Sequence, residues 1–230
     1  MISIWPLAGI PEIEPGVSLS DEIVAACRRA ELSITDGDIF VVTHKIVSKA
    51  EGRIAEILTD ADYRTLIAEE ASDIIRRRGD LVITRTRHGF ICANAAVDRS
   101  NTPDGTAVLL PIDPDRSAHR LRIGIERATR TTVGVLISDT FGRAWRRGQT
   151  DVAIGLSGVM SVLDLRGTTD HEGRELSATE VAVADELAGA ADLVMGKAAR
   201  IPVALIRGSG LLGEGRVADL IRDPQEDLFL

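Results

Sequence analysis

The sequence predicts an α+β protein in which helices flank a mixed sheet. Stretches with the apolar spacing of helices alternate along the chain with short apolar strands. Two expected strands, 81–86 and 89–97, follow each other across His88-Gly89, which is typical of a hairpin and not of a strictly parallel sheet. With 44% hydrophobic residues the chain can bury a full core, as one domain or two intimate lobes. Because no low-complexity linker or repeat divides it, we expect residues 1–230 to form a single domain.

Apolar periodicity and turn residues give the order of the elements. Ser18 with Asp21, and Ser177 with Glu180, have the spacing of capping boxes at the starts of two helices. Asp36-Gly37 is a turn signal, and the segment 100–106 is expected to be a loop. In chain order we expect helices over 18–32, 60–78, 114–129 and 177–197, and strands over 38–47, 81–86, 89–97, 131–138 and 201–208.

Charge and composition exclude several classes of function. The net charge of −8 gives no general attraction to nucleic acid or to an anionic membrane, so a bound anion needs a local cationic site. No apolar stretch is long enough to span a membrane, and the N-terminus does not resemble a signal peptide. The two cysteines and four histidines show neither a disulfide framework nor zinc spacing. We therefore expect a soluble cytoplasmic protein in which oxygen ligands would hold any metal.

Glycine-containing motifs do not predict a common nucleotide fold. The stretch GSGLLG (208–213) matches a dinucleotide fingerprint, but too few residues follow it for the second strand and its acid. A glycine-rich loop that permits close backbone approach is the favoured interpretation. The pair Gly196-Lys197 lacks both the glycine spacing and the Ser or Thr of a P-loop. Cys27, on an amphipathic helix, is expected in the core and not as a nucleophile.

Three stretches in which a strand runs into a loop could carry chemistry. In VVTHKIVSKAEGR (41–53), Lys45, Lys49 and Arg53 recur every four residues, which fits either a solvated face or a cation aimed at a phosphate. In NAAVDRSN (94–101), Asp98 leaves an apolar strand, either in an Asx-turn or as a ligand. Asp139 ends the strand of ISDTFGRAWRRGQTD (137–151) in the same way. If the two strands are neighbours, the two acids would suit Mg²⁺ or Mn²⁺ bound together with substrate phosphates.

Arginines follow Asp139 closely. Arg143, Arg146 and Arg147 present planar forks of donors that match carboxylates and phosphates, or they form a surface charge run neutralised by Asp139 and Asp151. Carboxylates for a divalent ion, a lysine for phosphate oxygens and arginines for further anions together favour phosphoryl transfer. The residues alone do not identify the substrate.

Six blocks of the sequence together resemble the CofE-type coenzyme F420:L-glutamate ligases, the gamma-glutamyl ligases of deazaflavin biosynthesis. The resemblance extends from about residue 5 to the C-terminus, and two blocks are highly specific, SDTFGRAWRRGQTD (138–151) and VVTHKIVSKAEGR (41–53). The remaining similarity lies in LAGIPEIEPG (7–16), NAAVDRSN (94–101), GRELSATEVAVADELAGAADLVMGK (173–197) and IPVALIRG (201–208). The resemblance implies the family's unusual α+β fold and an intertwined homodimer. It covers the ligase part only, so no fused C-terminal reductase domain is expected.

The resemblance also implies a reaction. GTP would phosphorylate the terminal carboxylate at the lactyl phosphate end of the deazaflavin, and the amine of L-glutamate would displace phosphate to form an amide. The product could be extended as a gamma-linked oligoglutamate. Mg²⁺ or Mn²⁺ is required in this family, often with a monovalent cation such as K⁺. The partners implied are the coenzyme F420 precursor, L-glutamate and a second copy of the chain, with no nucleic acid and no membrane.

Site residues are carried over from the family's motifs position by position. The metal positions fall on Asp98, Asp139 and Thr140. Lys49 would brace the nucleotide phosphates, while Arg143, Arg146 or Arg147 would receive anionic groups of the acceptor or glutamate; Asp98, Asp139, Lys49, Arg143 and Arg146 are thus the candidate catalytic residues. The nucleotide contacts fall on Ile10, Pro11, Glu12, Ile13, His44, Lys49, Asn101, Met195, Gly196, Lys197, Ala198, Ala199, Arg200, Ile201 and Pro202.

Two positions depart from the family. Relatives commonly carry Ser or Gln in place of His44, and archaeal members carry Gln or Glu near Lys197. These departures favour an alternative from another class, a regulatory protein that binds nucleotide or deazaflavin without turnover. A third interpretation, an amide ligase for another carboxylate acceptor, stays open because nothing in the residues identifies a deazaflavin ring.

Overall fold

Five strands form the central sheet of the computed structural model, which describes residues 1–100, 102–223 and 225–228. In order across the sheet they are β1 (Ser3–Pro6), β12 (Val203–Arg207), β2 (Ile39–Thr43), β8 (Gly134–Gly142) and β9 (Gln149–Ser157). The β2–β8 pair is parallel and the other three neighbouring pairs are antiparallel. The sheet is therefore mixed, and the predicted α+β class is confirmed.

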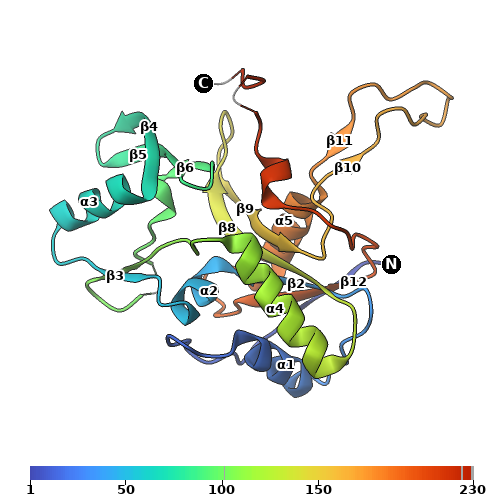
Figure 1. The fold of residues 1–230 in the computed structure, drawn as a ribbon, viewed down its shortest axis with the longest axis horizontal. Coiled ribbons are helices and arrows are strands. Elements are labelled where there is room, and N and C mark those ends of the chain that lie inside the picture. The colour runs from blue at the N-terminus through green and yellow to red at the C-terminus, as the bar shows by residue number, and fades with distance from the viewer. Residues whose placement is uncertain (101, 224, 229–230) are drawn as a thin grey trace.

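Helices cover both faces of this sheet (Figure 1). Phe40 and Val42 of β2 belong to the apolar cluster shared with α1 (Leu19–Arg29) and α4 (Pro114–Thr129). Ile39 and Val41 point to the opposite face and pack in the cluster shared with α5 (Val183–Met195). Because both faces are buried, β2 is continuously apolar instead of alternating with polar residues.

A smaller unit lies beside the central sheet, at the left of Figure 1. It has its own apolar cluster, which includes Ile67 and Val97. Its elements are β3 (Ile54–Glu56), α3 (Asp60–Glu70), β4 (Ala71–Arg78), β5 (Leu81–Thr86), β6 (Ile91–Ala93), the 3-10 turn η1 (Asn94–Ala96) and β7 (Thr106–Val108). Elsewhere, β10 (Leu163–Asp164) pairs with β11 (Glu180–Val181) at the base of an arm that projects from the sheet, and η2 (Val217–Leu220) is near the C-terminus.

Several local predictions are confirmed. Helix α1 begins after Ser18, the N-cap by position, although its side chain makes no capping hydrogen bond. Helix α4 matches the expected range, β12 lies within the expected last strand, and β5 and β6 form the hairpin around Gly89. The strand predicted over 89–97 is nevertheless too long, because β6 ends at Ala93 and Asn94–Ala96 form η1. Cys27 is buried in the core, and burial raises the pKa of its thiol to about 11, as suits an inert side chain.

The segment predicted as one strand over 38–47 is wrong in its second half. Strand β2 ends at Thr43, and the short helix α2 (His44–Ala50) follows immediately. The β-branched residues of this segment favour a strand locally. The helix forms where the chain leaves the sheet, and its residues Ile46 and Val47 pack in the main core.

The helix predicted over 60–78 is also wrong in its second half. A capping box between Thr59 and Asp62 starts α3, which ends at Glu70. Residues 71–78 form β4, which pairs antiparallel with β5. Pairing with a strand that follows later in the chain decides the conformation here, and periodicity within one segment cannot detect such pairing.

The long helix predicted from Ser177 begins later, at Val183. The expected capping box does not form, because Glu180 lies in β11 opposite Asp164. Strands β1, β3, β7, β9 and β10 were not predicted from the sequence.

The loop GSGLLG permits close backbone approach, as predicted. Gly208 and Gly210 have φ of +81° and +70°, and Leu212 bridges to Val159. A Cβ on Gly208 would lie 2.3 Å from the backbone carbonyl oxygen of Met1. No helix in the described part of the chain is long and apolar enough to cross a membrane.

Candidate active site

Helix α2 begins directly after β2, while the parallel neighbour β8 continues to Gly142. The prediction that Asp139 ends its strand is therefore wrong, because β8 runs on into the hairpin with β9 and Asp139 lies within it. Thr43 is paired with Ser138, so the next residues, His44 and Asp139, lie side by side. His44 Nε2 lies 3.3 Å from Asp139 Oδ1, and the imidazole is fully buried. Neither ring nitrogen of His44 has a hydrogen-bond partner within the described residues. The backbone N–H of Thr140 donates to Asp139 Oδ1 at 2.7 Å.

The second residue of α2 binds the other predicted metal ligand. Lys45 Nζ lies 2.7 Å from Asp98 Oδ2 and donates to Ser100 Oγ at 2.8 Å. The backbone N–H of Ser100 donates to Asp98 Oδ1 at 2.6 Å, so the Asx-turn interpretation of Asp98 is also correct. Burial raises the pKa of Asp98, but the hydrogen bonds from Lys45 and Ser100 outweigh burial and hold it below the usual range.

Adjacent residues of one helix thus contact both predicted metal ligands. The sequence suggested that Asp98 and Asp139 would meet if their strands were neighbours. This is wrong, because Asp98 bridges Val108 outside the central sheet. Helix α2, through His44 and Lys45, links the two carboxylates instead.

Lys49 lies in the last turn of the same helix and contacts the predicted nucleotide segment. Its ammonium forms an ion pair with Glu12, whose side chain is largely exposed, whereas Lys49 is buried. Ile13 is buried beside this pair, Ile10 packs on the core, and Pro11 is exposed. Arg53, by contrast, bonds to Glu70 and to the carbonyl of Leu110, away from these groups, and so has a structural role.

A second polar cluster joins Thr140 to the predicted segment Met195–Pro202. Lys197 Nζ donates to Thr140 Oγ1, lies 2.8 Å from Asp151 Oδ1 and lies 2.9 Å from Asp192 Oδ1. The buried Asp151 also accepts hydrogen bonds from Ser138 Oγ at 2.9 Å and Thr140 Oγ1 at 2.6 Å. Burial lowers the pKa of Lys197, but its bonds to Asp151 and Asp192 outweigh burial and raise it.

Asp151 and Asp192 were not predicted as site residues. Asp151 meets Thr140 because the two are register partners in the β8–β9 hairpin, and β9 had not been predicted. Asp192 lies in the last turn of α5. A single acid in an alanine-rich helix does not indicate a site residue in the sequence.

The rest of the segment 195–202 runs back to α2. Met195 is buried at the end of α5, and Gly196 follows with φ of +60°. Ala198, Ala199 and Arg200 are exposed. The carbonyl of Pro202, next to the half-buried Ile201, accepts the N–H of Thr43 at 2.9 Å, directly before His44. Asn101, also predicted to contact nucleotide, lies outside the described residues.

The three arginines lie apart from the carboxylates. Arg143, Arg146 and Arg147 are exposed in the turn of the β8–β9 hairpin, where Arg143 Nη2 donates to the carbonyl of Arg147 at 2.6 Å. Within the described residues none of them forms an ion pair with an acid. Neutralisation by Asp139 and Asp151 is therefore wrong for this conformation, and the guanidinium groups are available to a ligand.

The donor set suits a hard cation carried by phosphates. No three His, Cys, Asp or Glu side chains in the described ranges form a group that could hold a metal alone. Mg²⁺ needs no such cage, since it commonly takes one or two carboxylates plus water and substrate phosphates. Asp139 fits this role because, unlike Asp98 and Asp151, it contacts no lysine or arginine among the described residues.

Replacing Lys45 with methionine is expected to raise the pKa of Asp98, because burial of the carboxylate is then unopposed by the ammonium. The depressed pKa makes the pair stabilising above the unfolded value near pH 4 and ineffective below the folded value. At pH 7 we expect Lys45→Met to lose about 1 kcal/mol of unfolding free energy, and the loss should become smaller as the pH falls toward about 2.5. Carboxyl NMR titration and urea unfolding measure both effects. Lys45→Arg is the control, and equal losses at both pH values would contradict this account.

Comparison with known proteins identifies similar chains. The family model described as F420-0:Gamma-glutamyl ligase matches residues 9–208. Curated relatives named Coenzyme F420:L-glutamate ligase are similar over nearly the full length. The relative from Methanothermobacter thermautotrophicus is 40% identical across 99% of this chain and 98% of its own. The relatives from Methanopyrus kandleri and Archaeoglobus fulgidus are 40% and 36% identical, each across 99% of this chain and 97% and 96% of their own.

Proposed function

Because the chain belongs to the F420-0:gamma-glutamyl ligase family, we propose that it joins L-glutamate to the lactyl phosphate end of a coenzyme F420 precursor in a GTP-dependent reaction. The observation that carries the proposal is the arrangement around α2. Asp139, which contacts no lysine or arginine among the described residues, lies beside α2, the helix that contains Lys49 and binds Asp98 through Lys45. Such a group of carboxylates and ammonium ions is what phosphoryl transfer to a carboxylate requires.

The proposed reaction has two steps. In the first, a carboxylate oxygen of the acceptor attacks the γ-phosphorus of GTP, the bond to the β-phosphate oxygen breaks, and GDP leaves. In the second, the glutamate amine attacks the acyl carbon of the acyl phosphate, inorganic phosphate leaves, and the nitrogen loses a proton as the amide forms. Both steps bring several anionic groups together, so charge neutralisation lowers the barrier.

Each residue of the site has a task in this scheme. Asp139, Asp98 and the Thr140 hydroxyl would hold Mg²⁺ or Mn²⁺, which when bound supplies positive charge to the phosphate oxygens. Lys49 would exchange part of its contact with the exposed Glu12 for a phosphate oxygen. Arg143, Arg146 and Arg147 would bind the phosphodiester and carboxylates that the metal does not cover. The segment 195–202, which touches both Thr43 and Thr140, would contact the nucleotide.

Two further properties belong to the proposal. We expect a homodimer, and we expect K⁺ to assist only weakly, because the ammonium of Lys197 already lies among the oxygens of Thr140, Asp151 and Asp192. The monovalent charge that K⁺ would provide near Thr140 is supplied there by the chain itself.

A product assay tests the proposal. The purified chain is incubated with GTP, Mn²⁺, L-glutamate and the unglutamylated deazaflavin acceptor, and mass spectrometry detects acceptor that has gained a glutamyl unit. Matched reactions without GTP, or with D-glutamate, should give no product. Full product without any nucleotide would exclude the acyl-phosphate route.

The Lys197 contacts also favour a second candidate. An ammonium ion fixed among oxygens that a cation could use suits a protein that binds nucleotide or deazaflavin without turnover. Nucleotide binding with no glutamylated product would support this candidate. A parallel screen with other carboxylate acceptors separates both from an amide ligase of different specificity.

A further inference from the structure

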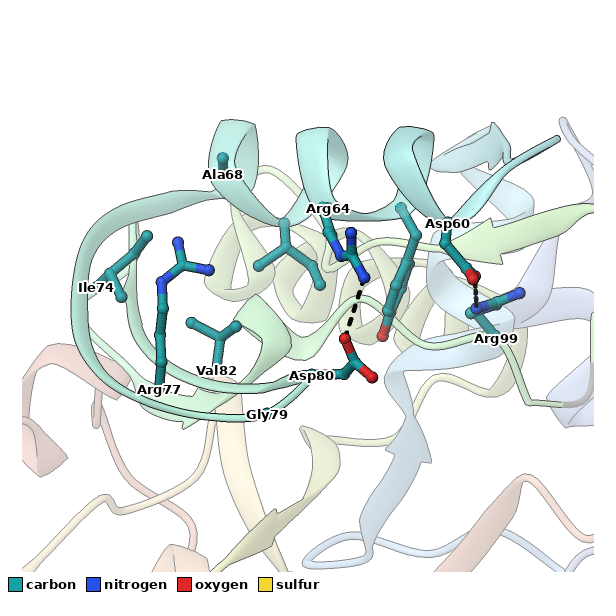
Figure 2. Close-up of a pocket in the computed structure, with 11 residues that line it drawn as sticks. Asp60, Arg64, Ala68, Ile74, Arg77, Gly79, Asp80, Val82 and Arg99 are labelled. Carbon is teal, nitrogen blue, oxygen red and sulfur yellow. Dashed lines mark hydrogen bonds and ion pairs between the residues drawn. The ribbon is translucent and has the colours of Figure 1, made fainter.

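A cavity of about 200 Å³ lies between α3 and the β4–β5 hairpin, in the smaller unit of the fold. Figure 2 shows the helix on one side and the hairpin on the other, with side chains from both turned into the space between them. None of its lining residues belongs to the candidate active site. Arg99, however, follows Asp98 directly in the chain, so the cavity borders the segment that carries one predicted metal ligand.

Positive groups stand at both ends of this cavity. Figure 2 shows Arg77 beside Ile74 at one end and Arg99 beside Asp60 at the other. Arg99 Nη1 lies 3.6 Å from Asp60 Oδ1, and its guanidinium lies 4.9 Å from the centre of the Tyr63 ring. Arg77 has no ion-pair or hydrogen-bond partner within the described ranges. The guanidinium of Arg99 is therefore positioned by Asp60 and Tyr63, whereas that of Arg77 is available to a ligand.

Acidic and apolar groups lie between the two ends. Asp80 is bonded to Arg64 at 3.1 Å but remains largely exposed, so its carboxylate can accept a second cationic partner. Ile67 and Val82 are 4% and 6% exposed and provide an apolar surface. From end to end, the order of groups along the cavity is Arg77, then the Arg64–Asp80 pair with apolar surface, then Arg99 with Asp60. With three guanidinium groups and two carboxylates, the lining is positively charged.

This order fits a small amino acid with two carboxylates. The two anionic ends would meet Arg77 and Arg99, the ammonium would meet Asp80, and the methylene groups would lie on Ile67 and Val82. The volume accommodates an amino acid but is below the range of about 300–1,000 Å³ that encloses drug-sized ligands. A nucleotide or a deazaflavin therefore does not fit inside it.

We propose that this cavity binds L-glutamate, with Arg77 and Arg99 holding its two carboxylates and Asp80 its ammonium. The choice of glutamate among dicarboxylic amino acids rests on the proposed function, whereas the ligand class rests on the cavity alone. Glutamate held here would lie next to the segment that carries Asp98, which makes this cavity the glutamate site of the proposed reaction.

Calorimetric titration of the full chain with L-glutamate, without GTP or acceptor, tests the site. We expect saturable binding that Arg77→Ala weakens by about tenfold or more, because a charge-assisted hydrogen bond to a carboxylate is lost. Arg76→Ala is the matched control, since Arg76 lies beside Arg77 on β4 but does not line the cavity. Glutarate, which lacks the ammonium, and L-glutamine, which lacks the second carboxylate, should each bind more weakly than glutamate.

Arg99→Ala provides a second, independent variant and should weaken glutamate binding as Arg77→Ala does. In the product assay, both variants should raise the KM for glutamate and leave that for GTP unchanged. Binding of glutamate to Arg77→Ala with wild-type affinity, or equal weakening by Arg76→Ala, overturns the proposal. Arginine-dependent glutamate binding without any ligated product would instead leave the site in place and refute the proposed ligase function.

Discussion

Asp139→Asn is expected to reduce glutamylation by a factor on the order of 100 or more. The substitution preserves size but removes the negative charge that makes Asp139 a ligand for Mg²⁺ or Mn²⁺, and several kcal/mol of charge stabilisation depend on that ion. Because Asp139 contacts no lysine or arginine among the described residues, its loss should leave the fold intact. Product formation is measured by mass spectrometry across a Mn²⁺ titration, and the loss should be largest at limiting Mn²⁺.

The matched variants separate the metal role from a general effect of charge. Asp98→Asn should also impair the reaction at limiting Mn²⁺, and it should in addition release Lys45. Asp21→Asn, an exposed change on α1, should leave activity and metal dependence unaltered. Full glutamylation at limiting Mn²⁺ in both Asp139→Asn and Asp98→Asn would show that these two carboxylates are not the metal ligands.

Lys197→Met is expected to lower both stability and activity. The variant leaves the buried Asp151 without its ammonium partner, which for a fully buried pair costs about 3–5 kcal/mol. Lys197 is more than half exposed, so water offsets part of this, and we expect a loss of about 1–3 kcal/mol. For a chain of 230 residues this corresponds to a fall in Tm of roughly 2–10 °C, measured by thermal unfolding.

The same variant should acquire a dependence on monovalent cations. With the ammonium gone, the oxygens of Thr140, Asp151 and Asp192 are left for K⁺, so KCl should restore stability and glutamylation more than an equal concentration of tetramethylammonium chloride. Lys197→Arg keeps the charge and should not respond to K⁺. Arg200→Met, an exposed change in the same segment, controls for the loss of a positive charge. Wild-type Tm and activity in Lys197→Met would show that this ammonium does not neutralise Asp151.

Elements with strong local signals could be predicted from the sequence. Helix α4 has Pro114 in its first turn after the N-cap Asp113, and the β5–β6 hairpin turns at a glycine with positive φ. Helix α2 could not be predicted in this way, because seven residues are too few for periodicity to distinguish a helix from a strand. Strand β4 depends on its pairing with β5, and that pairing is a tertiary contact.

The residues of the candidate site also differ in whether a local sequence signal or a tertiary contact reveals them. Asp98 and Asp139 could be selected because an acid after an apolar run is visible in the sequence, although Asp139 lies within β8 and Asp98 follows η1 instead of a strand. The contact between Asp151 and Thr140 depends on the register of a hairpin, and that of Asp192 with Lys197 depends on where α5 ends. The sequence order likewise suggested that the three arginines could neutralise Asp139 and Asp151. In the structure they are exposed in the turn of the β8–β9 hairpin.

The parallel pairing of β2 and β8 has a consequence for redesign. Both strands are buried on both faces, so the end of β2, where His44 begins α2, and the position of Asp139 within β8 are set by the rigid interior of the protein. Changes in the exposed turn 143–148 should leave these two residues in place, because that turn lies at the far end of the β8–β9 hairpin. Repacking the core around β2 or β8 would instead move His44 and Asp139 together. Substrate specificity should therefore be engineered in exposed segments, with β2 and β8 left unchanged.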